Sequence, residues 1–165
     1  MKIIPVILAM SVLTVPAQAA TAPNAQSFEG VWTISKFVRT GANAMTDLHP
    51  QPCVTIFTRG YFAIVRDNSH GTARQAAMPR DAAKPTDAEK IAKYDEWAPL
   101  TAAAGTYEVK GDTLVTRNTV AKQVRGVGLV ETAHFRFEGD RFIVTSKSDP
   151  GEPASEVEIT YTRVR

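Results

Sequence analysis

The sequence FRFEGDRFIV, residues 135–144, predicts a tight β-hairpin. A Gly-Asp pair at its centre is a two-residue turn signal between two runs of alternating apolar residues. Pairing across this turn places Phe137 opposite Phe142 and Phe135 opposite Val144 on one face, and the other face carries charged side chains. This alternation is typical of an antiparallel pair with one face on a core and the other in water.

Similar alternating segments extend along the chain on both sides of this hairpin, and two more compact turns are predicted at residues 58–61 and 110–113. We count eight strands, at about residues 30–39, 52–58, 61–67, 105–110, 113–119, 129–138, 141–147 and 156–164. Short strands broken by turn residues are typical of an all-β sandwich or barrel. We expect an eight-stranded antiparallel up-and-down barrel.

One helix is expected between the third and fourth of these strands. Thr86 as N-cap and Glu89 three residues later form a capping-box signal. Apolar positions then recur at helical spacing until Gly105, which is expected to end the segment. These positions are Ile91, Tyr94 and Ala98, with Trp97 beside them. We expect this stripe to pack against the barrel.

The connections alternate between short and long, and alternate connections of an up-and-down barrel lie at opposite ends. The long ones cover residues 40–51, 68–104, 120–128 and 148–155. This pattern predicts a barrel closed at one end by tight turns and rimmed at the other by long loops, with the helix as a candidate lid. An eight-stranded barrel has room for about one small ligand.

The N-terminal residues predict a cleaved secretory signal over residues 1–19. Lys2 precedes a short apolar run, which ends at an Ala-Gln-Ala site at residues 17–19. A flexible leader at 20–27 and one domain at 28–165 would follow, in a periplasmic or secreted protein. The single cysteine, Cys53, cannot form an internal disulfide.

The charge balance does not predict a basic surface that would bind nucleic acid. The chain has 19 Lys and Arg against 17 Asp and Glu, a net charge of +2. No segment after the signal is long and apolar enough to predict a membrane span. The histidines, at positions 49, 70 and 134, are scattered without metal-ligand spacing. We therefore expect neither a metal nor a cofactor, and no hydrolase, P-loop, Rossmann or zincin motif is present.

Several segments together resemble one protein family. Residues 30–32 read Gly-Val-Trp, similar to the G-x-W that opens the first lipocalin strand, and Arg163 stands where a last-strand Arg would cover Trp32. Residues 58–61, 105–109 and 135–141 add to the likeness. The chain thus resembles the bacterial lipocalin-like domain over most of residues 28–165, which implies a small-molecule-binding barrel. It has Thr-Arg-Asn at 116–118, where His-type polar residues would be expected.

The alternation also predicts which side chains face the interior. Counting from Trp32, Lys36 points inward, where it would anchor an acidic ligand, act as a base, or extend its amine to the mouth. Glu131 would lie on the same inner face nearer the mouth. The predicted ligand-binding residues are Ile34, Lys36, Val38, Tyr94, Trp97, Tyr107, Leu114, Thr116, Asn118, Glu131, Phe135 and Val144.

Three functions fit these patterns. The first is binding of a small apolar or amphipathic molecule inside the barrel. The second is a cofactor-independent isomerase, cyclase or lyase with Lys36 or Glu131 as general base. The third is a protein-interaction module, including a homo-oligomer, because the hairpin at residues 52–67 is apolar on both faces. Its inward set is either Cys53, Phe57, Phe62 and Ile64 or Val54, Ile56, Ala63 and Val65.

Overall fold

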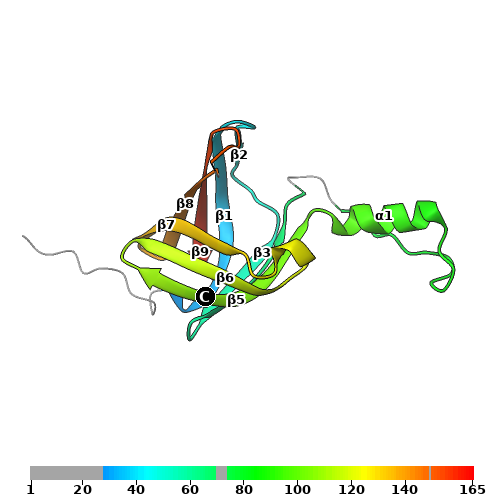
Figure 1. The fold of residues 1–165 in the computed structure, drawn as a ribbon, viewed down its shortest axis with the longest axis horizontal. Coiled ribbons are helices and arrows are strands. Elements are labelled where there is room, and N and C mark those ends of the chain that lie inside the picture. Colours follow the sequence, from blue (N-terminus) through cyan, green and yellow to red (C-terminus); the bar gives the residue numbers. More distant parts are fainter. Residues whose placement is uncertain (1–27, 70–73, 149) are drawn as a thin grey trace, which may run out of the picture.

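The computed structural model describes residues 28–69, 74–148 and 150–165, so the expected signal segment and leader lie outside the described residues. The described chain forms a closed antiparallel β-barrel, in which neighbouring strands follow one another around the wall (Figure 1). The wall strands are β1 (Gly30–Gly41), β3 (Cys53–Thr58), β4 (Tyr61–Asp67), β5 (Leu100–Lys110), β6 (Thr113–Ala121), β7 (Val130–Glu138), β8 (Arg141–Lys147) and β9 (Ser155–Arg163). Pairing of β1 with both β3 and β9 closes the barrel.

An additional strand, β2 (Met45–Asp47), lies in the expected loop after β1 and pairs with the upper part of β1. Because of β2, the helix follows the fourth strand of the chain and not the third. The pairing of β1 with β3 covers only residues 30–32. Beyond this point β1, β2 and β9 rise away from β3, β4 and β5 (Figure 1), so the barrel widens toward its long loops.

The helical segment was expected to continue to Gly105, but strand β5 already begins at Leu100, so the predicted segment is too long. Residues 101–104 are Thr-Ala-Ala-Ala, and alanine favours helix, but pairing with β4 along this whole stretch overrides the local preference. Gly105 lies inside β5 at an irregularity in the register with β6. A Cβ atom there would collide with the backbone carbonyl of Arg117, so the close approach of the strands requires glycine.

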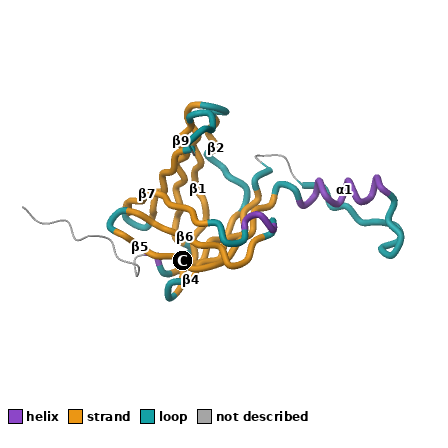
Figure 2. Tube along the Cα trace, in the orientation of Figure 1, coloured by secondary structure: helices purple, strands orange, loops and turns teal. Residues whose placement is uncertain are grey.

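Helix α1 (Asp87–Trp97) begins at the predicted capping box. The Glu89 backbone N–H donates to Thr86 Oγ1 at 3.3 Å, and the Thr86 backbone N–H donates to Glu89 Oε2 at 2.8 Å. The predicted docking on the barrel is wrong. None of the residues of α1 is buried, and the helix lies beyond the barrel wall (Figures 1 and 2).

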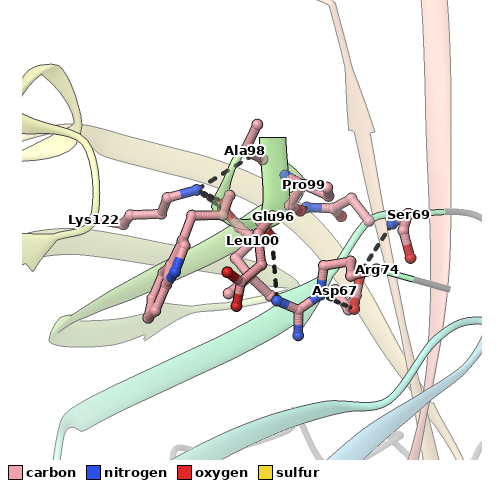
Figure 3. Close-up of polar contacts among 10 residues, drawn as sticks. Asp67, Ser69, Arg74, Glu96, Ala98, Pro99, Leu100 and Lys122 are labelled. Atoms are coloured by element: carbon pink, nitrogen blue, oxygen red, sulfur yellow. Dashed lines mark hydrogen bonds and ion pairs between the residues drawn. The ribbon is translucent and has the colours of Figure 1, made fainter. Parts of the chain in front are cut away.

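Polar contacts hold α1 in this position. We call residues 74–97 the arm. At its base Arg74 Nε donates to Asp67 Oδ2 at 2.7 Å, and Arg74 Nη1 donates to the Glu96 carbonyl at 3.2 Å (Figure 3). Lys122 donates from the other side to the carbonyls of Trp97, Ala98 and Leu100. The arm is therefore fixed to the ends of β4, β5 and β6 by hydrogen bonds instead of by apolar packing.

Acid should loosen the arm, because its carboxylates accept hydrogen bonds. The backbone N–H groups of Arg80 and Thr86 lower the pKa of Glu89, and the Lys93 ammonium together with the Ala77 N–H lowers that of Glu96, from an ordinary 4.5. A lowered carboxyl pKa contributes stability above its ordinary value, which is lost as the pH falls through the folded value.

We expect the NMR signals of the Ala77 and Arg80 amide protons to titrate below pH 4.5, while the amide of Leu114 in the barrel wall stays constant. In Glu96→Gln the Ala77 titration should disappear and the Arg80 titration should remain. Signals of Ala77 and Arg80 that do not change between neutral pH and the acid range would contradict these hydrogen bonds.

The core fills the end of the barrel with the tight turns. Phe28, which precedes β1, is fully buried, and its ring lies 4.7 to 6.1 Å from five other aromatic rings. The buried cluster consists of Phe28, Trp32, Ile34, Cys53, Phe57, Phe62, Tyr107, Leu114, Phe135, Phe142 and Tyr161. Arg163 covers the Trp32 ring at 4.1 Å from its centroid, as the sequence predicted.

The structure also decides the orientation of the β3–β4 hairpin. Its inward side chains are Cys53, Phe57 and Phe62 of the core, Ile64, which packs against the core, and the buried Thr55. Its outward side chains are Val54, Ile56, Ala63 and Val65. The outward set stays apolar although it faces solvent.

Candidate ligand site at the wide end of the barrel

Polar side chains follow the aromatic core on the inner wall, toward the wide end. Cys53 pairs with Arg66 across β3 and β4, and both lie on the side of Phe57 and Phe62. Thr116 pairs with Glu131 across β6 and β7, on the side of Leu114. Together with Thr55 and Tyr161 these residues form what we call the inner polar ring: Cys53, Thr55, Arg66, Thr116, Glu131 and Tyr161.

Arg66 is the unusual member of this ring. Its Nε is buried and has no hydrogen-bond partner among the described residues, nor does Arg66 form an ion pair with any of them. Thr55 Oγ1 is also buried without a partner in the described part of the chain. Buried polar groups are nearly always hydrogen-bonded, so two unpaired ones in a single wall indicate a place for a partner that the described residues do not supply.

Tyr161 lies on the opposite wall, with its ring stacked on Phe142 at 4.4 Å and 8°. Burial raises the pKa of its phenol to about 12, and the charge on Glu131 acts in the same direction, while Arg66 opposes it. The phenol therefore stays neutral at physiological pH and is available as a hydrogen-bond donor. Arg66 lies on the inner side of β4 by its pairing with Cys53, and its charge is near enough to Tyr161 to act on this pKa.

The predicted inward orientation of Lys36 and Val38 is wrong. The register of β1 and β9 shifts between Ile34 and Lys36, so that Ile34 pairs with Tyr161 but Lys36 pairs with Thr160. This bulge inserts one residue and reverses the side-chain alternation. Lys36 consequently lies on the outer face, where its Nζ is 3.9 Å from Glu158 Oε1, and Lys36 cannot act as a base inside the barrel.

Most other predicted site residues lie on the inner wall, but at different depths. Ile34, Tyr107, Leu114 and Phe135 are 5 to 6 % exposed and belong to the packed core, with Val144 against it. Ile34 is level with the inner polar ring, because it pairs with Tyr161 and its backbone N–H donates to Cys53 Sγ at 3.0 Å. Thr116 and Glu131 lie in the ring itself, and Glu131 is exposed to solvent.

Asn118 and the two aromatic residues of the helix have other surroundings. Asn118 is buried, and its Nδ2 donates to the Gly126 carbonyl at 3.2 Å, which ties β6 to the 3₁₀ helix η2 (Val124–Gly126). Its Oδ1 has no partner among the described residues. Tyr94 and Trp97 are 73 % and 49 % exposed on the arm and do not cover the mouth.

Sequence reasoning missed Arg66, Thr55 and Tyr161 as a group. Arg66 follows from the hairpin alternation once the Cys53 face is known to point inward, but the sequence left both faces open. Tyr161 carried no signal beyond its place in the last strand. Tyr161 shares the barrel interior with the hairpin residues Thr55 and Arg66 because β9 pairs with β1, far away in sequence.

Two hollows lie outside the barrel interior. One, of about 550 Å³, lies between α1 and the segment 74–78 of the arm. The other, of about 490 Å³, lies on the outer face of β7, β8, β9 and β1. Its Lys36 and Arg136 form ion pairs with glutamates of the same face. Neither hollow contains a residue of the inner polar ring.

No group of three or more potential metal ligands occurs within residues 28–69, 74–148 and 150–165. None of the helices in the described ranges is long and apolar enough to cross a membrane.

Comparisons with known proteins give two similar structures. No protein-family model matches the chain, and no curated protein does. A lipocalin-like protein from Bacteroides uniformis is 11 % identical, with 84 % of this chain and 99 % of that chain covered and a TM-score of 0.47. An uncharacterized protein from Bacteroides eggerthii is 9 % identical, with coverages of 83 % and 99 % and a TM-score of 0.45.

Proposed function

We propose that this barrel binds an amphipathic small molecule with one anionic group, such as a carboxylate, at its wide end. The observation that carries this proposal is the buried Nε of Arg66 in the inner wall, which has no hydrogen-bond partner among the described residues. A buried N–H of a guanidinium is unfavourable unless an anion or another acceptor satisfies it. Its planar array of donors suits a carboxylate or phosphate, which it can bind through two parallel hydrogen bonds.

The surroundings of Arg66 supply the other half of an amphipathic site. Ile34 belongs to the buried core, Ile64 packs against it, and Tyr161 offers a neutral phenol. Ligand sites are usually apolar with a few polar groups that fix orientation, and the inner polar ring fits this description. The apolar part of the ligand would rest on the core and its anionic group on Arg66.

Glu131 favours a single anionic group over a highly charged ligand. Its carboxylate lies on the same inner face and influences the pKa of Tyr161, so it repels further negative charge. For the alternative enzymatic function, Lys36 is no longer a candidate base because it lies on the outer face. Glu131 remains as the candidate carboxylate inside the barrel. We further propose the periplasmic or secreted location expected from residues 1–19.

Two fluorescent probes test the proposal. Anilinonaphthalene sulfonate is apolar with one anionic group, and N-phenylnaphthylamine has nearly the same rings without the charge. A charge-assisted hydrogen bond contributes about 1.5 to 3 kcal/mol, so Arg66→Met should weaken binding of the sulfonate about 10- to 100-fold. Binding of the neutral probe should change less than threefold.

Glu131→Gln is the matched control, because it removes a charge of opposite sign from the same ring. It should bind the sulfonate more tightly than the parent protein and leave the neutral probe unaffected. Equal sulfonate affinity in the parent, Arg66→Met and Glu131→Gln would contradict an anion site at Arg66. Mass spectrometry of small molecules retained by the native protein is a separate experiment that identifies the natural ligand. We expect this ligand to carry an acidic group.

A further inference from the structure

The outer surface of the barrel carries an apolar face that nothing in the described chain covers. One row of side chains crosses five strands by direct pairing, and a second row crosses three. The first row is Val31, Ile56, Ala63, Ala104 and Val120, and the second is Val54, Val65 and Ala102. We call these eight residues the outer apolar face. Its valines and isoleucine are 38 to 59 % exposed.

This face departs from the usual composition of a solvent-facing sheet. Antiparallel sheets with one wet side alternate apolar-in and polar-out, and the β7–β8 hairpin of this protein does so. None of the eight residues of the outer apolar face is charged. Contiguous apolar surfaces of this kind mark interaction sites in soluble proteins.

The arm presents a second uncovered apolar surface. Ile91, Tyr94 and Trp97 follow at intervals of three along α1 and are 49 to 73 % exposed, and Met78 is 83 % exposed. The helix lies beyond the ends of β4 and β5, so these side chains do not reach the outer apolar face of their own barrel (Figure 1). The contacts of Arg74 and Lys122 at its base hold the arm out in this position (Figure 3).

We propose that this protein forms a symmetric dimer in which the arm of each copy packs its Ile91, Tyr94 and Trp97 onto the outer apolar face of the other. The occupant is a second copy because one chain carries both unpartnered surfaces. The two surfaces are complementary in shape, because the outer apolar face is wide and uncharged and the arm projects a narrow row of large side chains. A twofold axis then makes both contacts at once.

The surface area that the two arm contacts would bury agrees with the area buried in stable dimers. Large aromatic side chains bury about 150 to 250 Å² each, so an arm with two of them plus Met78 and Ile91 would cover about 500 Å² of its own surface. Two such contacts, counted on both partners, amount to about 2,000 Å², which lies at the upper end of standard stable interfaces. The charged side chains of α1, among them Lys90 and Asp87, would remain in solvent at the rim.

Sedimentation equilibrium from micromolar to millimolar concentration tests the dimer. The parent chain should show twice the monomer mass, and Tyr94→Ala/Trp97→Ala (the arm variant) should need at least 100-fold more protein to dimerise. Ile56→Asp/Val65→Asp (the face variant) should lose dimerisation equally. Val124→Asp, at a 90 % exposed position outside both surfaces, should keep it.

Mixing the two variants separates this arrangement from others. The intact arm of the face variant can still dock on the intact face of the arm variant, so labelled mixtures should associate although each variant alone does not. A monomeric parent chain, an arm variant that dimerises normally, or a mixture without association would each overturn the proposal. The melting temperatures of the arm variant and the face variant should equal that of the monomeric parent chain, because all four substituted residues lie outside the core.

Discussion

Phe28→Ala is expected to lose about 3 to 5 kcal/mol of unfolding free energy, as truncation of a fully buried aromatic residue does. The ring is 0 % exposed and lies within 5.3 Å of the rings of Phe57, Phe135, Phe137 and Phe142. Three strands, β3, β7 and β8, supply these neighbours, so the cavity would open at the centre of the closed end and could not collapse easily. Urea unfolding, followed by far-ultraviolet circular dichroism, measures the loss.

Two variants control for this effect. Phe28→Leu keeps much of the volume and should lose less than half as much stability as Phe28→Ala. Val124→Ala changes a 90 % exposed side chain and should stay within about 0.5 kcal/mol of the parent. If Phe28→Ala were as stable as Val124→Ala, Phe28 would not close the barrel.

The order of the strands and their approximate bounds could be predicted because they depend on local signals. Alternation fixes which side chains share a face, and turn residues fix where a strand reverses. The register of the β7–β8 hairpin, with Phe137 opposite Phe142 and Phe135 opposite Val144, was confirmed for this reason. The meeting of Trp32 with Arg163, which the resemblance implied, agrees with the pairing of the first strand with the last.

The orientation of Lys36 could not be predicted because a bulge leaves no clear mark in the sequence. The one extra residue near Ser35 reverses every later side chain of β1, and Ser35 is compatible with either arrangement. The bulge is stabilised by partners remote in sequence: Ser35 Oγ donates to the Thr160 carbonyl at 3.3 Å, and Thr162 Oγ1 donates to Ser35 Oγ at 2.9 Å.

Helix α1 shows the same division between local and distant causes. Its start at Thr86 was predicted because a capping box involves only four consecutive residues. Its position was not, since it depends on contacts of Glu96 and Trp97 with Arg74 and Lys122. The candidate site was the hardest part to predict from the sequence. Arg66 and Tyr161 face one interior only because the strands close into a barrel.

Trp32→Ala should be about as damaging as Phe28→Ala, and clearly more damaging than Arg163→Ala. Trp32 is 1 % exposed, and its Nε1 donates to the Phe28 carbonyl at 2.8 Å, so truncation opens a cavity and leaves a buried acceptor unpaired. We expect a loss of about 3 to 5 kcal/mol. The guanidinium of Arg163 lies over the same ring at 4.1 Å, and a stacked cation contributes about 0.5 to 2 kcal/mol.

Comparing the variants by urea unfolding distinguishes the roles of the two residues. Because Arg163 acts mainly through the Trp32 ring, the double variant should be little less stable than Trp32→Ala alone, and a double-mutant cycle measures this coupling. Neither single variant should alter the affinity for anilinonaphthalene sulfonate in the folded protein, since Trp32 lies at the closed end and Arg66 toward the wide end. A fully additive cycle would mean that Arg163 contributes to stability through its contact with Glu29 and not through the indole.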